Sequence, residues 1–108
     1  FEQYTAVLVR ARGLSAEVTC PSGDDGVDVY ATGQGGERCA IQCKRYSKPV
    51  GPSVIRELAA SRDLKGCDSA ILVTTSTVTP GAARMAEELG VDTIDGDHLV
   101  ALHMERGV

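Results

Sequence analysis

Residues 27–45, VDVYATGQGGERCAIQCKR, decide the fold. Their middle, residues 33–36, contains three glycines, whose tolerance of positive φ suits a tight turn. On both sides of the glycines, apolar and polar residues alternate, which is typical of strands with two different faces. The stretch therefore predicts an antiparallel hairpin with strands at about 27–32 and 38–45. A phosphate-binding loop is not expected here, because no helix follows the glycines and the Lys-Ser/Thr pair of such loops is absent.

The predicted hairpin gathers polar side chains on one face. If the pairing is centred on Gly35, Asp28 lies opposite Gln42, and Lys44 follows on the same face. A carboxylate, an amide and an ammonium group are then expected within one small patch. The opposite face carries only apolar residues, which are Val27, Val29, Ile41 and Cys43. From alternation alone, the commoner explanation is a solvated polar face whose Asp–Lys pair stabilises the sheet only modestly.

Outside the hairpin, the sequence predicts alternating helices and strands. Thr79 and Pro80 begin one helix and Gly90 ends it, and similar capping residues mark the other boundaries. The predicted helices are at about 1–12, 51–62, 79–89 and from 97 onward, and the remaining strands are at 14–20, 70–73 and 91–94. The apolar face of the second helix comprises Ile55, Leu58 and Ala59. The order helix, three strands, helix, strand, helix, strand, helix indicates an α/β fold, a mixed sheet with helices on both faces.

Length and composition indicate one domain. The chain has 108 residues, begins without Met inside a predicted helix, and is therefore expected to be a fragment of a longer protein. Aromatic residues make up 4%, so the core is expected to be aliphatic. No apolar run is long enough to cross a bilayer and no basic signal region opens the chain, so a cytoplasmic location away from membranes is expected. The formal net charge of −4 disfavours strong binding of nucleic acid by this piece alone.

The cysteines and histidines lack the spacing of a metal site. The four cysteines form no CxxC pair and are expected to be reduced core thiols. His98 and His103 are five residues apart on a predicted helix and point in different directions. Neither a zinc site, a disulfide nor a catalytic histidine is predicted.

The local sequence around the hairpin resembles a known family. Residues 22–29, SGDDGVDV, and residues 41–46, IQCKRY, resemble the signature of Mrr-type restriction endonucleases, which belong to the PD-(D/E)xK nuclease superfamily. Residues 71–75, ILVTT, and residues 94–96, IDG, extend the resemblance over nearly the whole chain. The resemblance implies a restriction-endonuclease-like fold for a single catalytic domain spanning residues 1–108.

The resemblance also implies an active site. The family positions that match Asp28, Gln42 and Lys44 are active-site residues, and a glutamate of the first helix, here Glu2, often joins them. Mg²⁺, with Mn²⁺ as a substitute, would be held by Asp28, Glu2, the Gln42 amide oxygen and the main-chain carbonyl of Cys43. Lys44 would orient or deprotonate the attacking water. Most branches of the superfamily have an acidic residue where this chain has Gln42, which leaves the metal affinity and the number of ions open.

The predicted partner is DNA. Arg45 and Lys48 belong to the densest basic cluster and are expected to contact the DNA backbone. Arg56, Arg62 and Lys65 follow on the next helix and its end as further candidates for such contacts. The function that the resemblance implies is metal-dependent endonuclease cleavage of foreign or modified DNA. A separate recognition domain and a homodimer are further expectations. Two alternatives remain: a non-catalytic DNA-binding or assembly module with the nuclease fold, and a small α/β ligand-binding domain.

Overall fold

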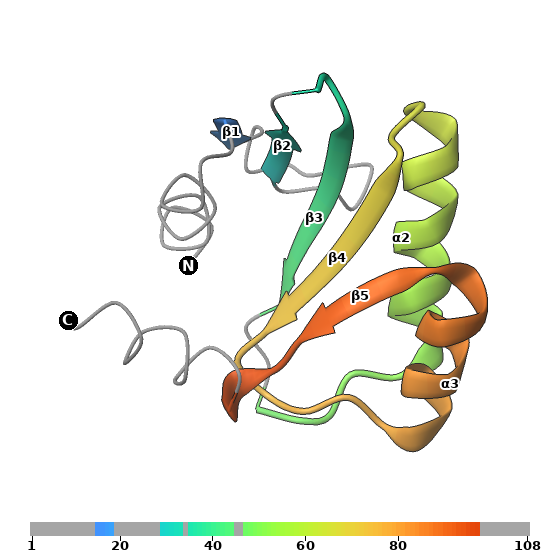
Figure 1. Cartoon of the computed structure of the whole chain (residues 1–108). Coiled ribbons are helices and arrows are strands. Elements are labelled where there is room, and N and C mark those ends of the chain that lie inside the picture. The colour runs from blue at the N-terminus through green and yellow to red at the C-terminus, as the bar shows by residue number, and fades with distance from the viewer. Residues whose placement is uncertain (1–14, 19–28, 34, 45–46, 98–108) are drawn as a thin grey trace, which may run out of the picture.

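The computed structural model describes residues 15–18, 29–33, 35–44 and 47–97 (Figure 1). These residues form one mixed sheet whose spatial order follows the chain, β1-β2-β3-β4-β5. The first three strands are antiparallel, and β3, β4 and β5 are parallel. The strands are β1 (Ser15–Val18), β2 (Val29–Thr32), β3 (Arg38–Lys44), β4 (Ser69–Thr74) and β5 (Val91–Ile94), and the helices are α2 (Pro52–Leu64) and α3 (Pro80–Leu89). The predicted α/β fold with a mixed sheet is confirmed.

The hairpin has the predicted register. Val29 pairs with Ile41 and Tyr30 with Ala40, which is the pairing centred on Gly35. In the turn, the Gly33 amide donates to the Glu37 carbonyl at 2.9 Å, and Gly36 adopts a φ of 87°. That left-handed conformation favours glycine, because a Cβ atom would be strained there. The glycine-rich stretch is therefore a hairpin turn, as expected.

Both faces of the sheet are covered. On one face, Ala40 and Leu72 pack with residues of α2 and α3, and Figure 1 shows these two helices together on one side of the sheet. The second face has its own buried cluster, which comprises Val29, Ala31, Ile41, Cys43 and Val73. The helices predicted at 1–12 and from 97 onward lie outside the described residues except for Gly96 and Asp97, whose backbone is helical.

The ends of α3 follow the predicted capping residues. The Thr79 hydroxyl accepts a hydrogen bond from the Ala82 amide at 3.1 Å, and Pro80 occupies the first turn. Gly90 ends the helix with a φ of 70°. The buried residues of α2 are the predicted Ile55, Leu58 and Ala59. The sequence-based boundaries of both described helices are confirmed to within two residues.

Arg62 has a structural role that its sequence context did not suggest. Its Nη1 atom donates to the Leu89 carbonyl at 2.7 Å, so a cation from the end of α2 caps the end of α3. Lys65 follows α2 near the start of β3, where the Asp68 amide donates to the Arg38 carbonyl. Arg62 and Lys65 thus lie near the start of β3, at the other end of the strand from Lys44, and their predicted contact with DNA stays a prediction.

The described cysteines are free thiols, as predicted. Burial raises the pKa of the Cys39 thiol, and its hydrogen bond with Ser69 acts in the opposite direction. A raised pKa lowers the fraction of reactive thiolate at neutral pH. Within the described part of the chain, no helix has the length and apolar character needed to span a bilayer.

Candidate active site

Gln42 is the buried polar residue of the central strand. It lies on β3 with 3% of its surface exposed, on the same face as Ala40 and therefore beneath the helices. The expectation of a merely solvated polar face does not describe this residue. A buried amide is costly unless its polar atoms find partners, so its presence on the covered face of the sheet requires a physical reason.

The Gln42 amide oxygen has no such partner. Its Oε1 atom is fully buried and accepts no hydrogen bond, the single such side-chain atom found in the described part of the chain. Leaving a buried acceptor unpaired costs about 1–3 kcal/mol. A neutral carbonyl oxygen is a good ligand for Mg²⁺, which prefers oxygen donors. The orphaned atom therefore fits the metal site that was predicted at this position.

Lys44 follows Gln42 on the same face, at the end of β3. It is half-buried and pairs in the parallel ladder with Thr74, the last residue of β4. Its main-chain carbonyl accepts a hydrogen bond from the Thr75 amide at 3.2 Å. The strand end thus places the lysine where the buried sheet face meets the surface, as a group that acts on a bound substrate must be.

The structure describes only some of the other predicted site residues. Asp28, Glu2 and Arg45 lie outside the described residues, so their predicted roles remain predictions. The side chain of Cys43 is buried on the opposite sheet face, which leaves only its main-chain carbonyl for the predicted ligand role. Lys48 is exposed in the segment after β3, as a residue that contacts a DNA backbone would be.

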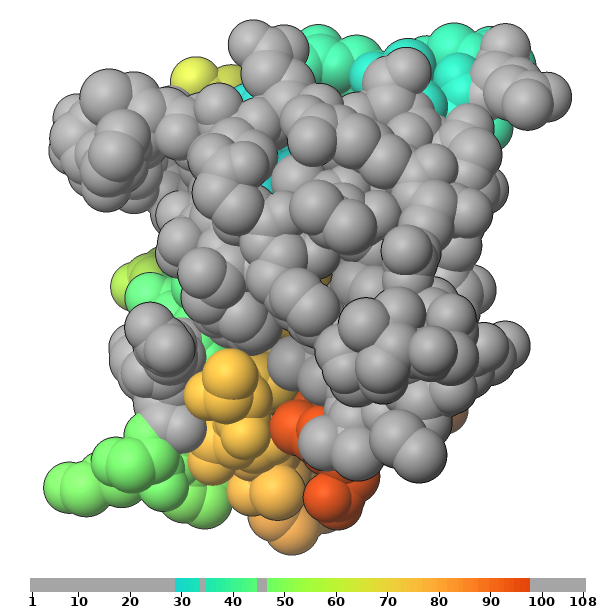
Figure 2. Space-filling view, turned by 90° about the vertical axis from the view of Figure 1, so that its left-hand side faces the viewer, coloured from blue at the N-terminus to red at the C-terminus, as the bar shows by residue number. Residues whose placement is uncertain are grey.

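Backbone hydrogen bonds connect the segments that follow β3, β4 and β5 at their carboxyl ends. The Val50 amide donates to the Thr77 carbonyl at 2.8 Å, and the Gly96 amide donates to the Ser76 carbonyl at 2.8 Å. Figure 2 shows coloured segments that follow these three strands grouped at one end of the molecule. Ligands of open α/β sheets bind outside the carboxyl ends of the strands, so this edge is the expected place for a reaction. Lys44 lies there.

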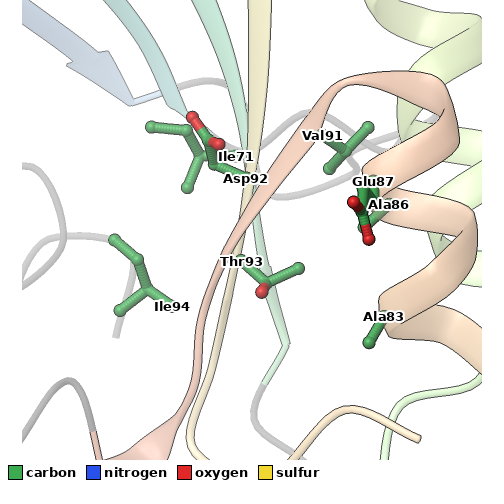
Figure 3. A pocket seen from close by; sticks show the side chains of 8 residues that line it. All are labelled: Ile71, Ala83, Ala86, Glu87, Val91, Asp92, Thr93 and Ile94. Carbon is green, nitrogen blue, oxygen red and sulfur yellow. The ribbon is translucent and has the colours of Figure 1, made fainter. Parts of the chain in front are cut away.

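A shallow hollow of about 590 Å³ lies elsewhere, along β5 and α3 (Figure 3). Its lining includes Ala86, Val91 and two carboxylates, Glu87 and Asp92, which Figure 3 shows on different sides of the β5 ribbon. It contains neither Gln42 nor Lys44. Since its carboxylates diverge, the hollow has no convergent polar groups and is not the candidate active site.

The sequence assigned no role to Thr74 or Gly96, although both belong to stretches that carry the family resemblance. Thr74 is fully buried, and its hydroxyl accepts a hydrogen bond from the Ser76 amide at 3.1 Å. Gly96 lies so close to the Thr75 carbonyl that an added Cβ atom would collide with it. A threonine ending a continuously apolar strand and a glycine after the next strand were the available signals.

Solved structures share this fold. A protein of unknown function, AF1548, is 20% identical with a TM-score of 0.83 over 98% of the chain. The DNA modification-dependent restriction endonuclease AspBHI is 25% identical with a TM-score of 0.79 over 100% of the chain, and the MspJI restriction endonuclease, solved with a 27-mer oligonucleotide, is 22% identical with a TM-score of 0.73 over 94%. The chain spans 65%, 31% and 26% of these three proteins, respectively.

The sequence itself identifies the family. No curated protein matches the chain. The Mrr catalytic family model, described as restriction endonuclease, matches residues 1–103, which is nearly the whole chain and includes both strands of the hairpin. The chain therefore belongs to the restriction endonuclease family of Mrr catalytic domains.

Proposed function

We propose that this domain is a metal-dependent endonuclease that hydrolyses DNA phosphodiesters at a centre built from Asp28, Gln42 and Lys44. Family membership supports DNA cleavage as the general activity. The observation that carries the specific proposal is the orphaned Oε1 atom of Gln42 on the sheet face that also carries Lys44. A non-catalytic module would gain nothing from keeping this unpaired acceptor, whereas a metal site would use it.

The confirmed hairpin register supports the place proposed for Asp28. The last described pair is Val29 with Ile41, so continuing the ladder by one residue would pair Asp28 with Gln42. Asp28, Glu2, Gln42 Oε1 and the Cys43 carbonyl would hold Mg²⁺ or Mn²⁺. The ion would supply neutralisation of the negative charge that develops at the scissile phosphate.

Lys44 would act on the attacking water. Its ammonium group would orient the water oxygen toward phosphorus and stabilise the charge that forms as the new P–O bond is made. As its oxygen bonds to phosphorus, the water gives up one proton to solvent. The P–O bond to the leaving sugar oxygen breaks, and that oxygen takes up a proton from solvent. The half-buried position of Lys44 supports this role, because it excludes much of the competing water while leaving the group within reach of DNA.

DNA binding would involve more than this domain. Lys48 is exposed beside the site and Arg45 adjoins it in sequence, so both would contact the DNA backbone without reading its sequence. With a formal net charge of −4, the domain would need a separate recognition domain, and a homodimer would allow both strands to be cut. AspBHI, which shares the fold, is a DNA modification-dependent restriction endonuclease, and this supports modified or foreign DNA as the substrate class. We place this activity in the cytoplasm.

The test is cleavage of supercoiled plasmid in Mg²⁺, in Mn²⁺ and in chelator. Wild type is expected to nick or cut only when a divalent cation is present, and Asp28→Ala is expected to lose all cleavage. Asp63→Ala is the matched control, because Asp63 is exposed at the far end of α2 and pairs only with Arg62 among the described residues. Salt-sensitive DNA binding without nicking in either cation would instead favour a non-catalytic module.

A further inference from the structure

Thr74 is a buried polar residue next to the proposed catalytic lysine. It is 0% exposed, and in the described part of the chain Thr74 and Gln42 are the two buried polar residues. In the parallel ladder, Thr74 pairs with Lys44, and Leu72 pairs with Gln42. Paired residues of neighbouring strands point to the same side, so Thr74 lies on the proposed active-site face.

The Thr74 hydroxyl closes a turn at the end of β4. Its Oγ1 atom accepts a hydrogen bond from the Ser76 amide at 3.1 Å, a local bond that threonine commonly makes in turns. The turn presents the amide of Thr75, which donates to the main-chain carbonyl of Lys44 at 3.2 Å. The turn thus links the buried hydroxyl of β4 to the backbone of the lysine on β3.

The same turn is fixed from the side of β5. The Ser76 carbonyl accepts a hydrogen bond from the Gly96 amide at 2.8 Å. Gly96 also packs so tightly against the Thr75 carbonyl that an alanine there would require the backbone to move. The turn is therefore held on both sides. Because Gly96 leaves it no room to move toward β5, loss of the Thr74 hydrogen bond is expected to shift the backbone of Lys44.

We propose that Thr74 is a positioning residue for DNA cleavage: through the 74–76 turn, its hydroxyl fixes the backbone of Lys44 and hence the place of the ammonium group. This inference rests on the proposed function, and it adds a residue that touches neither metal nor DNA. Misplacing a catalytic group by about 1 Å can cost roughly 100-fold in rate. The loss should appear in kcat, because Thr74 is too deeply buried to contact the substrate.

The test compares Thr74→Val, which keeps the shape but removes the hydroxyl, with Thr74→Ser, which keeps the hydroxyl. Thr74→Val is expected to lower kcat by roughly 100-fold, with little change in the KM for DNA, whereas Thr74→Ser keeps most of the rate. Amide hydrogen exchange gives a readout that is independent of cleavage. Exchange at Thr75 and Ser76 is expected to accelerate in Thr74→Val and to stay near wild type in Thr74→Ser.

Thr93→Val is the matched control, because it removes a hydroxyl from the adjoining strand without touching the turn. It is expected to cleave like wild type. If Thr74→Val does not fold, Thr74→Cys against Thr74→Ser gives the same comparison, since sulfur is a weak acceptor. Equal rates for wild type and Thr74→Val, or equal losses in Thr74→Val and Thr74→Ser, would overturn the inference alone. A wild-type full-length protein that cuts no DNA in either cation would overturn the proposed function and this inference with it.

Discussion

Lys44→Met is expected to lower the rate of plasmid cleavage by roughly 100- to 10,000-fold, the usual contribution of a group that transfers protons or stabilises charge in the transition state. Methionine keeps the length and apolar character of the lysine stem, so the end of β3 should remain packed. The melting temperature should therefore change little, and the loss should appear in kcat measured at saturating DNA and cation.

Lys65→Met is the control for this substitution. Lys65 follows α2 near the start of β3, whereas Lys44 is at the end of that strand. The rise of a strand separates the two ends of β3 by about 20 Å. Lys65→Met changes the net charge by the same amount as Lys44→Met, so any general electrostatic weakening of DNA binding appears in both variants. Full activity of Lys44→Met, or equal losses in the two variants, would show that Lys44 has no specific part in the reaction.

Gln42→Met is expected to stabilise the fold while it removes metal-dependent cleavage. Methionine replaces a buried amide by an apolar group of similar shape, so the unpaired Oε1 atom disappears. The free energy of unfolding should rise by about 1–3 kcal/mol, the cost of one buried unsatisfied polar group. Thermal unfolding in chelator measures the gain, and plasmid cleavage in Mg²⁺ measures the loss.

Gln42→Glu separates the two effects. A carboxylate at this buried position should destabilise the domain in chelator, because its charge has no partner there, and a divalent cation should restore much of the lost stability. Cleavage should survive, since an acidic residue is the usual ligand at this position in the wider superfamily. If Gln42→Met proved less stable than wild type and equally active, the amide would be a packing residue and not a ligand.

The hairpin could be predicted because its signals are local. The glycines predicted the turn, and the alternation of apolar and polar residues on both sides predicted the register that pairs Val29 with Ile41. The capping of α3 by Thr79 and Gly90 is local in the same sense. The family resemblance identified Gln42 and Lys44 as site residues, whereas alternation alone predicts a solvated face for both.

The burial of the site could not be predicted in the same way. Alternation shows that Gln42 and Lys44 share a face, but whether helices cover that face depends on contacts between distant segments. Thr74 was missed for the same reason. Its proposed role depends on its pairing with Lys44 on β3 and on the hydrogen bond from the Ser76 amide, and both form only in the folded structure. The structural role of Arg62 could not be predicted either, because its partner, the end of α3, lies 27 residues further along the chain.

The most direct test of the proposed centre is a crystal structure of the domain grown with Mn²⁺, in which anomalous scattering locates the ion. The account predicts one strong peak coordinated by Gln42 Oε1 and the Asp28 carboxylate, with the Lys44 ammonium group close by. A peak elsewhere with Gln42 Oε1 hydrogen-bonded to protein, or Asp28 and Gln42 on opposite faces of the hairpin, would contradict it.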